Sequence, residues 1–170
     1  MSAPLELRFV VDGPPVPIQR PRFDPRTKRT YPDFKGNDYK VRVRGEARAA
    51  AARERVDGRL VRREPRWPSS DDCAKAVYRR RGTPSPKCSC DWCSRRYEVE
   101  LLLVVADKRA RDLDNLAKGI LDGSTGALWR DDSQVVRLAM TKAINPTRPR
   151  VEVLVRVCAG AQLELAGGAS

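Results

Sequence analysis

The sequence predicts an α+β fold, a two-layer sandwich in which a small mixed β-sheet carries helices on one face. Two segments alternate apolar and polar residues as strands do, two more read as strands, and two segments between them have helical composition or spacing. The length of 170 residues suits one domain. We therefore expect a single domain over residues 1–170, interrupted by an irregular, basic and cysteine-containing insertion at about residues 58–96.

The amino-terminal part alternates regular and irregular segments. Residues 5–11 alternate apolar and polar side chains, which predicts a half-buried strand. Residues 14–36 contain six prolines, so we expect an extended loop with a cationic face. An alanine-rich helix over residues 37–56, capped by Asn37 or Asp38, should follow. The aromatic residues of the loop either stack on nucleic-acid bases or fasten the loop to the core; they are Phe23, Tyr31 and Phe34.

The carboxy-terminal half has clearer patterns. Residues 97–106 predict a strand whose far end is buried on both sides. A basic bend leads to a helix that starts at Leu113, with Asp112 at its N-cap position, and that stops at Gly123 and Gly126. The last two predicted strands are residues 135–144 and 151–157.

Composition excludes several kinds of chemistry. The chain contains no histidine, so serine–histidine and cysteine–histidine nucleophiles, a histidine general base and histidine metal ligands are all ruled out. The net charge is +12, and residues 20–96 carry 23 basic and 10 acidic residues, against 11 and 12 in the rest of the chain. This concentration of positive charge favours a polyanionic partner, most simply nucleic acid, over a generic basic surface that serves solubility.

The start of the sequence lacks the pattern of a secretory signal, and its longest wholly apolar run, residues 101–106, is far too short to cross a membrane. We therefore expect a cytoplasmic protein. In such a protein, the four clustered cysteines either bind a structural zinc ion as thiolates or stay reduced without a ligand. They are Cys73, Cys88, Cys90 and Cys93.

Carboxylates stand at two places where chemistry is plausible. Asp112 and Asp114 follow a buried strand at a helix start, and Asp132 follows Asp131. Such carboxylates supply the oxygen ligands that Mg²⁺ prefers, and Mg²⁺ hydrolysis needs no histidine. Lys118 lies one helical turn after Asp114, where it would orient a carboxylate or neutralise phosphate charge. The alternative is an ordinary N-cap at Asp112 and an Asp114–Lys118 surface pair.

The stretch DKRARDLDNLAKGILDGSTGALWRDDSQV resembles the signature region of the RusA family of Holliday-junction resolvases. That family carries a D-L-D-N-L-x-K helix start and then an aspartate pair before Q-V. The earlier stretch VDGPPVPIQRPRF is similar to the family's first strand and its G-x-P-x-P…R-P-R-F loop. The resemblance covers most of residues 5–157 apart from about 58–96, and it implies a single RusA-like nuclease domain.

The resemblance also implies roles for particular residues. Asp112, Asp114 and Asp132 match the catalytic, Mg²⁺-binding aspartates of the family. Lys118 matches its essential lysine, and Asp131 is the neighbouring carboxylate. The implied activity is that of an endodeoxyribonuclease that resolves four-way DNA junctions, in recombination and repair. A homodimer would place two active sites on opposite strands and make paired, symmetric nicks.

The sequence departs from the family pattern in one further place, and it also fits other functions. The link after Lys118 is slightly shorter than in the family and contains Gly119 and Gly123. The main alternative function is a non-catalytic, zinc-stabilised DNA-binding protein in which the aspartates only cap and pair; a nuclease for forks or flaps is a third. Basic residues that flank the motifs either contact phosphates or are solvated surface charges; they are Arg20, Arg22, Lys108, Arg109 and Arg111.

Overall fold

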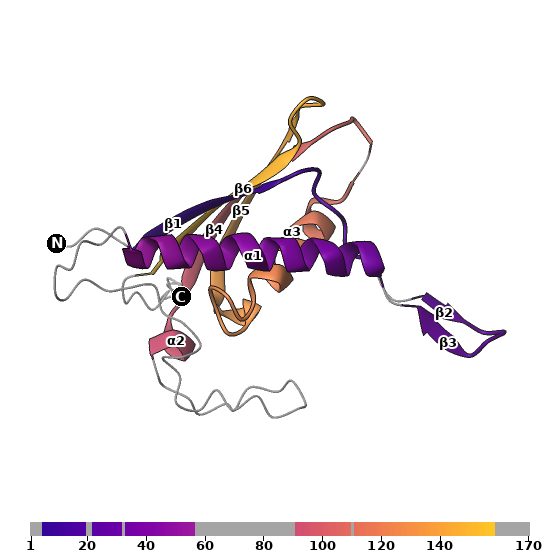
Figure 1. Cartoon of the computed structure of the whole chain (residues 1–170), viewed down its shortest axis with the longest axis horizontal. Coiled ribbons are helices and arrows are strands. Elements are labelled where there is room, and N and C mark those ends of the chain that lie inside the picture. The colour runs from indigo at the N-terminus through magenta and orange to yellow at the C-terminus, as the bar shows by residue number, and fades with distance from the viewer. Residues whose placement is uncertain (1–4, 20–21, 32, 57–90, 110, 159–170) are drawn as a thin grey trace, which may run out of the picture.

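One layer of the protein is a four-stranded mixed sheet with the strand order β1–β6–β4–β5 (Figure 1). Strand β6 is antiparallel to both β1 and β4, whereas the edge strand β5 is parallel to β4. The strands are β1 (Glu6–Asp12), β4 (Tyr97–Val105), β5 (Val135–Ile144) and β6 (Arg150–Val157), as the alternation of the sequence predicts. The computed structural model describes residues 5–19, 22–31, 33–56, 91–109 and 111–158.

Two helices cover one face of this sheet (Figure 1). They are α1 (Phe34–Val56) and α3 (Leu113–Ser124). Alternate strand residues such as Phe9 and Val153 are buried against helix residues such as Tyr39 and Ile120 in one core. The predicted two-layer α+β fold is therefore confirmed. None of the described helices is long and apolar enough to span a membrane.

The proline-rich loop is more regular than the sequence predicts. Strands β2 (Arg22–Asp24) and β3 (Arg29–Tyr31) pair as an antiparallel hairpin. The prediction of a wholly extended loop was wrong because Pro25 lies in the turn, where proline is well tolerated. Helix α1 also begins earlier than predicted, because the side chain of Asp33 caps it: its Oδ1 accepts a hydrogen bond from the amide of Gly36 at 3.0 Å.

The glycines of the link after Lys118 have a packing role. Gly123 does not stop α3, which continues to Ser124. A Cβ atom at Gly123 would lie 2.7 Å from Cβ of Val43, so α1 and α3 approach each other closely there. A side chain of any size would force the two helices apart. These glycines therefore fix the position of α3, and with it the position of the aspartates at its start.

Candidate active site

The bend that leads into α3 is organised by Asp107. Its Oδ1 accepts a hydrogen bond from the amide of Arg109 at 3.1 Å, and its Oδ2 pairs with Nη2 of Arg111 at 3.1 Å. The side chain of Arg111 is only 21% exposed, and its Nη1 is buried without a hydrogen-bond partner among the described residues. Lys108 and Arg109, by contrast, are exposed. The bend thus presents two of the predicted phosphate contacts to solvent and keeps the third beside the start of α3; Arg20 and the side chain of Arg22 lie outside the described residues.

The two aspartates at the start of α3 are exposed and are not used by the helix. Asp112 occupies the N-cap position, but its side chain makes no capping hydrogen bond. Its Oδ2 instead accepts a long hydrogen bond, 3.4 Å, from Nδ2 of Asn115. Asp114 forms no ion pair with Lys118, or with any other described residue. The cap and the surface pair that offered an alternative explanation of these residues are therefore not formed in the part of the chain that the structure describes.

Two neighbouring aspartates stand at the start of the short 3₁₀ helix η2 (Asp132–Gln134), and they make different contacts. Asp131 is the N-cap: its side chain accepts a hydrogen bond from the amide of Ser133 at 3.0 Å, and Oε1 of Gln134 accepts one from the amide of Asp131 at 3.1 Å. Hydrogen bonds from the side chain and the amide of Ser133 hold the pKa of Asp131 below its ordinary value. Asp132 is exposed and makes no hydrogen bond or ion pair with a described residue.

These carboxylates fit a divalent cation only in part within one chain. Asp112 and Asp114 offer accessible oxygen atoms from one helix turn, which suits a hard ion such as Mg²⁺. However, no group of three or more cysteine, aspartate or glutamate side chains among the described residues could hold a metal ion. Asp132 therefore does not join the other two in a three-carboxylate cluster here.

A lysine that the sequence analysis did not single out lies beside the start of α3. Nζ of Lys142, on β5, donates a long hydrogen bond of 3.4 Å to the carbonyl oxygen of Arg111, one residue before Asp112. Lys142 is paired in register with the core residue Leu103, so it occupies the helix-covered side of the sheet. Lys142 is nevertheless exposed, because β5 is the edge strand. Lys118 itself is exposed on α3.

The described end of the insertion is fastened to η2. The short helix α2 (Asp91–Ser94) contains Cys93, whose Sγ accepts a hydrogen bond from Nη1 of Arg130 at 3.1 Å. Nε2 of Gln134 donates to the carbonyl oxygen of Arg95 at 3.1 Å. The insertion therefore rejoins the fold next to the acidic turn. The other cysteines of the predicted zinc site lie outside the described residues, so that site stays a prediction; they are Cys73, Cys88 and Cys90.

Comparison with known proteins agrees with the motif. The family model described as "Endodeoxyribonuclease RusA" matches residues 12–156, a span that includes α3, η2 and the hairpin. The uncharacterized protein YqaN of Bacillus subtilis (strain 168) is 30% identical over 154 residues, which cover 88% of this chain and 95% of that protein.

Proposed function

Because the chain belongs to the RusA family of endodeoxyribonucleases, we propose that it resolves Holliday junctions by a Mg²⁺-dependent pair of symmetric nicks. Membership makes the protein an endonuclease of branched DNA; the metal, the nicking pattern and a cytoplasmic location are the proposal. The observation that carries it is the availability of three carboxylates. Asp112, Asp114 and Asp132 are exposed and form neither a cap nor an ion pair with a described residue.

The proposed roles follow from where these side chains lie. Asp112 and Asp114 would hold Mg²⁺, and on this proposal Asp132, which lies apart from them in the structure of one chain, joins them when the metal binds. Mg²⁺, when bound, polarises the phosphodiester and lowers the pKa of the attacking water. Nδ2 of Asn115 restrains the carboxylate of Asp112. Cations near the start of α3 stabilise the negative charge that builds up on the phosphate. On this proposal those cations are Arg111, Lys118 and Lys142, and Lys108 and Arg109 bind flanking phosphates.

The test of this proposal is the cleavage of a synthetic four-way junction, with the nicks mapped on all four strands and a linear duplex as control. We expect symmetric nicks that require Mg²⁺ and stop with EDTA. Asp112→Asn should keep junction binding and lose cleavage. Unchanged cleavage by Asp112→Asn contradicts the assigned site. Absence of cleavage of any branched DNA by the wild type favours the non-catalytic alternative, and stronger cleavage of forks or flaps changes the substrate.

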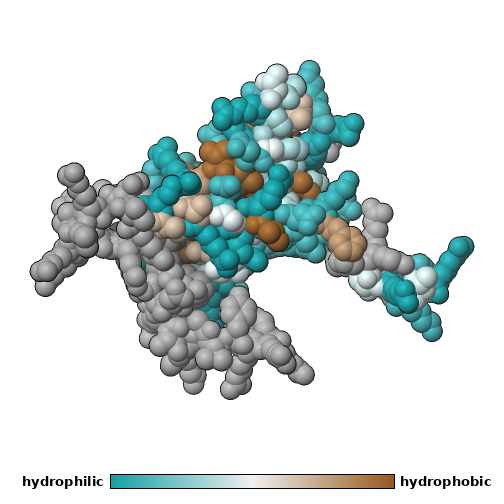
Figure 2. Space-filling model, viewed as in Figure 1, coloured by the Kyte–Doolittle hydropathy of each residue, from teal (hydrophilic) through white to brown (hydrophobic). Residues whose placement is uncertain are grey.

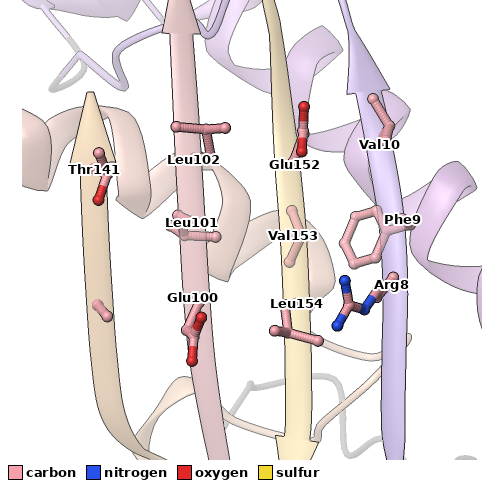
Figure 3. Close-up of a pocket in the computed structure, with 11 residues that line it drawn as sticks. Arg8, Phe9, Val10, Glu100, Leu101, Leu102, Thr141, Glu152, Val153 and Leu154 are labelled. Atoms are coloured by element: carbon pink, nitrogen blue, oxygen red, sulfur yellow. The ribbon is translucent and has the colours of Figure 1, made fainter. Parts of the chain in front are cut away.

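Nicks on opposite strands need two active sites, so we also propose a homodimer. The face of the sheet opposite the helices is the surface that we assign to the second copy. It contains a hollow of about 470 Å³ in which Val10, Leu102 and Leu154 lie among charged side chains of both signs (Figure 3). A surface that carries both signs around an apolar centre can complement a second copy of itself across a two-fold axis.

Sedimentation velocity tests the dimer and its surface together. We expect a dimer for the wild type and a monomer for Leu154→Arg, which places a charge in the centre of that face. Val41→Arg is the matched control, because Val41 is 65% exposed on α1 and lies on a different surface. A monomeric wild type contradicts the dimer, and a dimeric Leu154→Arg protein contradicts the choice of surface.

We further propose that Cys73, Cys88, Cys90 and Cys93 bind a structural zinc ion. The four thiols are a sufficient tetrahedral set for zinc, and Cys93, the one that the structure describes, lies beside Arg130 where the insertion rejoins the fold. Metal analysis of the purified protein should find one zinc ion per chain and a loss of zinc in Cys90→Ser. A zinc-free wild type contradicts the proposal.

A further inference from the structure

The β2–β3 hairpin lies apart from the main sheet, beyond the first turn of α1 (Figure 1). Its strands pair Phe23 with Thr30 and Asp24 with Arg29, and residues 25–28 form the turn. Lys28 in this turn adopts the left-handed conformation, with φ at 52°. Hydrophilic residues predominate at this end of the molecule (Figure 2). The hairpin is therefore a projection with its own hydrogen bonding, and it takes no part in the core.

Asp24, the acidic residue of the hairpin, accepts the hydrogen bonds that hold the turn. Oδ1 of Asp24 accepts a hydrogen bond from the amide of Arg26 at 2.8 Å, and Oδ2 accepts one from Oγ1 of Thr27 at 3.0 Å. These bonds hold the pKa of Asp24 below its ordinary value, so the turn is maintained wherever the carboxylate is charged. The basic residues Arg26, Lys28 and Arg29 are exposed, and none forms an ion pair with a described residue. Their charge is thus available to an external anion.

An exposed aromatic ring stands beside these cations. Phe23 is 62% exposed and makes no ring contact with a described residue. Burial of an aromatic side chain is strongly favourable, so an exposed ring on a projecting element is a candidate contact for a ligand. Aromatic rings among cations bind single-stranded or unstacked nucleic acid by stacking on a base. Phe23 and the cations together therefore match an unstacked nucleotide with its phosphate.

The base of the hairpin is attached to the catalytic helix. The amide of Gln19 donates to Oδ2 of Asp33 at 2.8 Å, and the amide of Ile18 donates to the carbonyl oxygen of Asn115 at 3.3 Å. Ile18 also packs where a side chain at Gly119 would lie, with its Cδ1 at 3.3 Å. The chain that leads into the hairpin thus rests on the first turn of α3. DNA held by the hairpin would continue toward the aspartates at that turn.

We propose that the β2–β3 hairpin is an arm that recognises the branch point of DNA. Arg26, Lys28 and Arg29 contact phosphates, and Phe23 stacks on a base that has lost its neighbour at the centre of the junction. Every base of a linear duplex is stacked on both sides, so the ring has no equivalent contact there. The arm therefore contributes to the preference for branched over linear DNA. This inference rests on the proposed function, because it assumes that branched DNA is the substrate.

Binding to a four-way junction and to a linear duplex tests the arm, in the full chain with Asp112→Asn added so that no DNA is cut. We expect Phe23→Ala to weaken junction binding roughly tenfold and to leave duplex binding nearly unchanged. Val41→Ala is the control, because Val41 is 65% exposed on α1 and lies outside the hairpin. It should bind both DNAs as the parent protein does.

The cations predict a different signature. Replacing Arg26, Lys28 and Arg29 together by alanine should weaken binding to both DNAs and reduce the slope of log affinity against log salt by about three. An unchanged salt slope in the triple alanine variant overturns the proposed arm. So does an equal loss of affinity for the junction and the duplex in Phe23→Ala. Dissociation of the dimer by either change also overturns it, because the loss of binding would then not come from the hairpin. If the wild type cleaves junctions and Phe23→Ala binds them normally, only the arm is wrong. If the wild type binds junctions but cuts no branched DNA, the nuclease proposal fails and the arm stands.

Discussion

The helix α3 and the 3₁₀ turn η2 both have an aspartate at the N-cap position, but only η2 uses its side chain as a cap. At η2, Asp131 accepts a hydrogen bond from the amide of Ser133 and closes a capping box with Gln134. At α3, Asp112 stands in the same N-cap position, yet its carboxylate accepts only the distant side-chain amide of Asn115. A carboxylate that caps a helix has its oxygen atoms occupied, whereas one that does not is available to a cation.

The same distinction applies along α3 itself. Oδ2 of Asp122 pairs with Nζ of Lys40 at 2.7 Å and so ties α3 to α1. Asp114, two turns earlier, has no such partner among the described residues. Two aspartates on one helix therefore have different roles, a structural one and, on our proposal, a metal-binding one. Residue type alone does not separate them; the contacts that the fold makes do.

The largest effect on cleavage is expected at Asp114, and it tests the difference between Asp114 and Asp122 directly. Asp114→Asn should reduce the rate of junction cleavage at least about 100-fold, because a metal ligand is lost, and should leave the melting temperature nearly unchanged. Asp122→Asn is the matched control on the same helix: it removes the ion pair with Lys40 and should keep cleavage. Equal loss of cleavage in the two variants would show that disturbance of α3, and not of a metal ligand, explains the result.

A smaller effect is expected at Lys142, the cation beside Asp112. Lys142→Met should lower the single-turnover cleavage rate about tenfold, since one positive charge near the reacting phosphate is lost. Junction affinity measured without Mg²⁺ should change much less, and Lys142→Arg should recover part of the rate. Lys35→Met, at an exposed position on α1, controls for the loss of a surface charge. A Lys142→Met protein that cleaves as fast as the wild type removes this residue from the site.

The smallest expected effect is on stability, and it concerns Asp131, the aspartate that caps η2. Asp131→Ala should lower the free energy of unfolding at neutral pH by about 1 kcal/mol, through loss of the cap. Because the pKa of Asp131 is lowered in the folded state, its contribution is present above the ordinary value of 3.8 and is lost as the pH falls through the folded value. Urea unfolding at neutral and acid pH measures this. A difference between wild type and Asp131→Ala that persists undiminished in acid contradicts the capping role.

The fold and the site differ in how far the sequence could predict them. The strands could be predicted because apolar residues alternate along β1 and β6 and form a continuous apolar run at the end of β4. The hairpin could not, since the prolines of residues 14–36 suggested irregular structure although none lies within the two strands. Helix α1 is capped by Asp33, and not by Asn37 or Asp38 as predicted, because the carboxylate of Asp33 accepts a hydrogen bond from the amide of Gly36.

At the site, the motif named the aspartates, but a motif does not show which carboxylate caps and which is free. That difference depends on hydrogen bonds made after folding, such as those of Ser133 and Gln134 at η2. Lys142 could not be placed from sequence, because its position beside Asp112 depends on the parallel pairing of β5 with β4. Local hydrogen bonds at η2 and a contact between distant segments at Lys142 therefore account for what the sequence left open.

Asp131 and Asp132, which are neighbours at η2, offer the most direct test of the central claim. The claim is that the carboxylates that form no cap and no ion pair in the fold bind the metal ion for DNA cleavage. The measurement is single-turnover cleavage of a four-way junction, with Mg²⁺, by Asp132→Asn beside Asp131→Asn. We predict at least a 100-fold loss in Asp132→Asn and a rate close to wild type in Asp131→Asn, since asparagine is itself a good cap. Full activity in Asp132→Asn with loss of activity in Asp131→Asn would contradict the account.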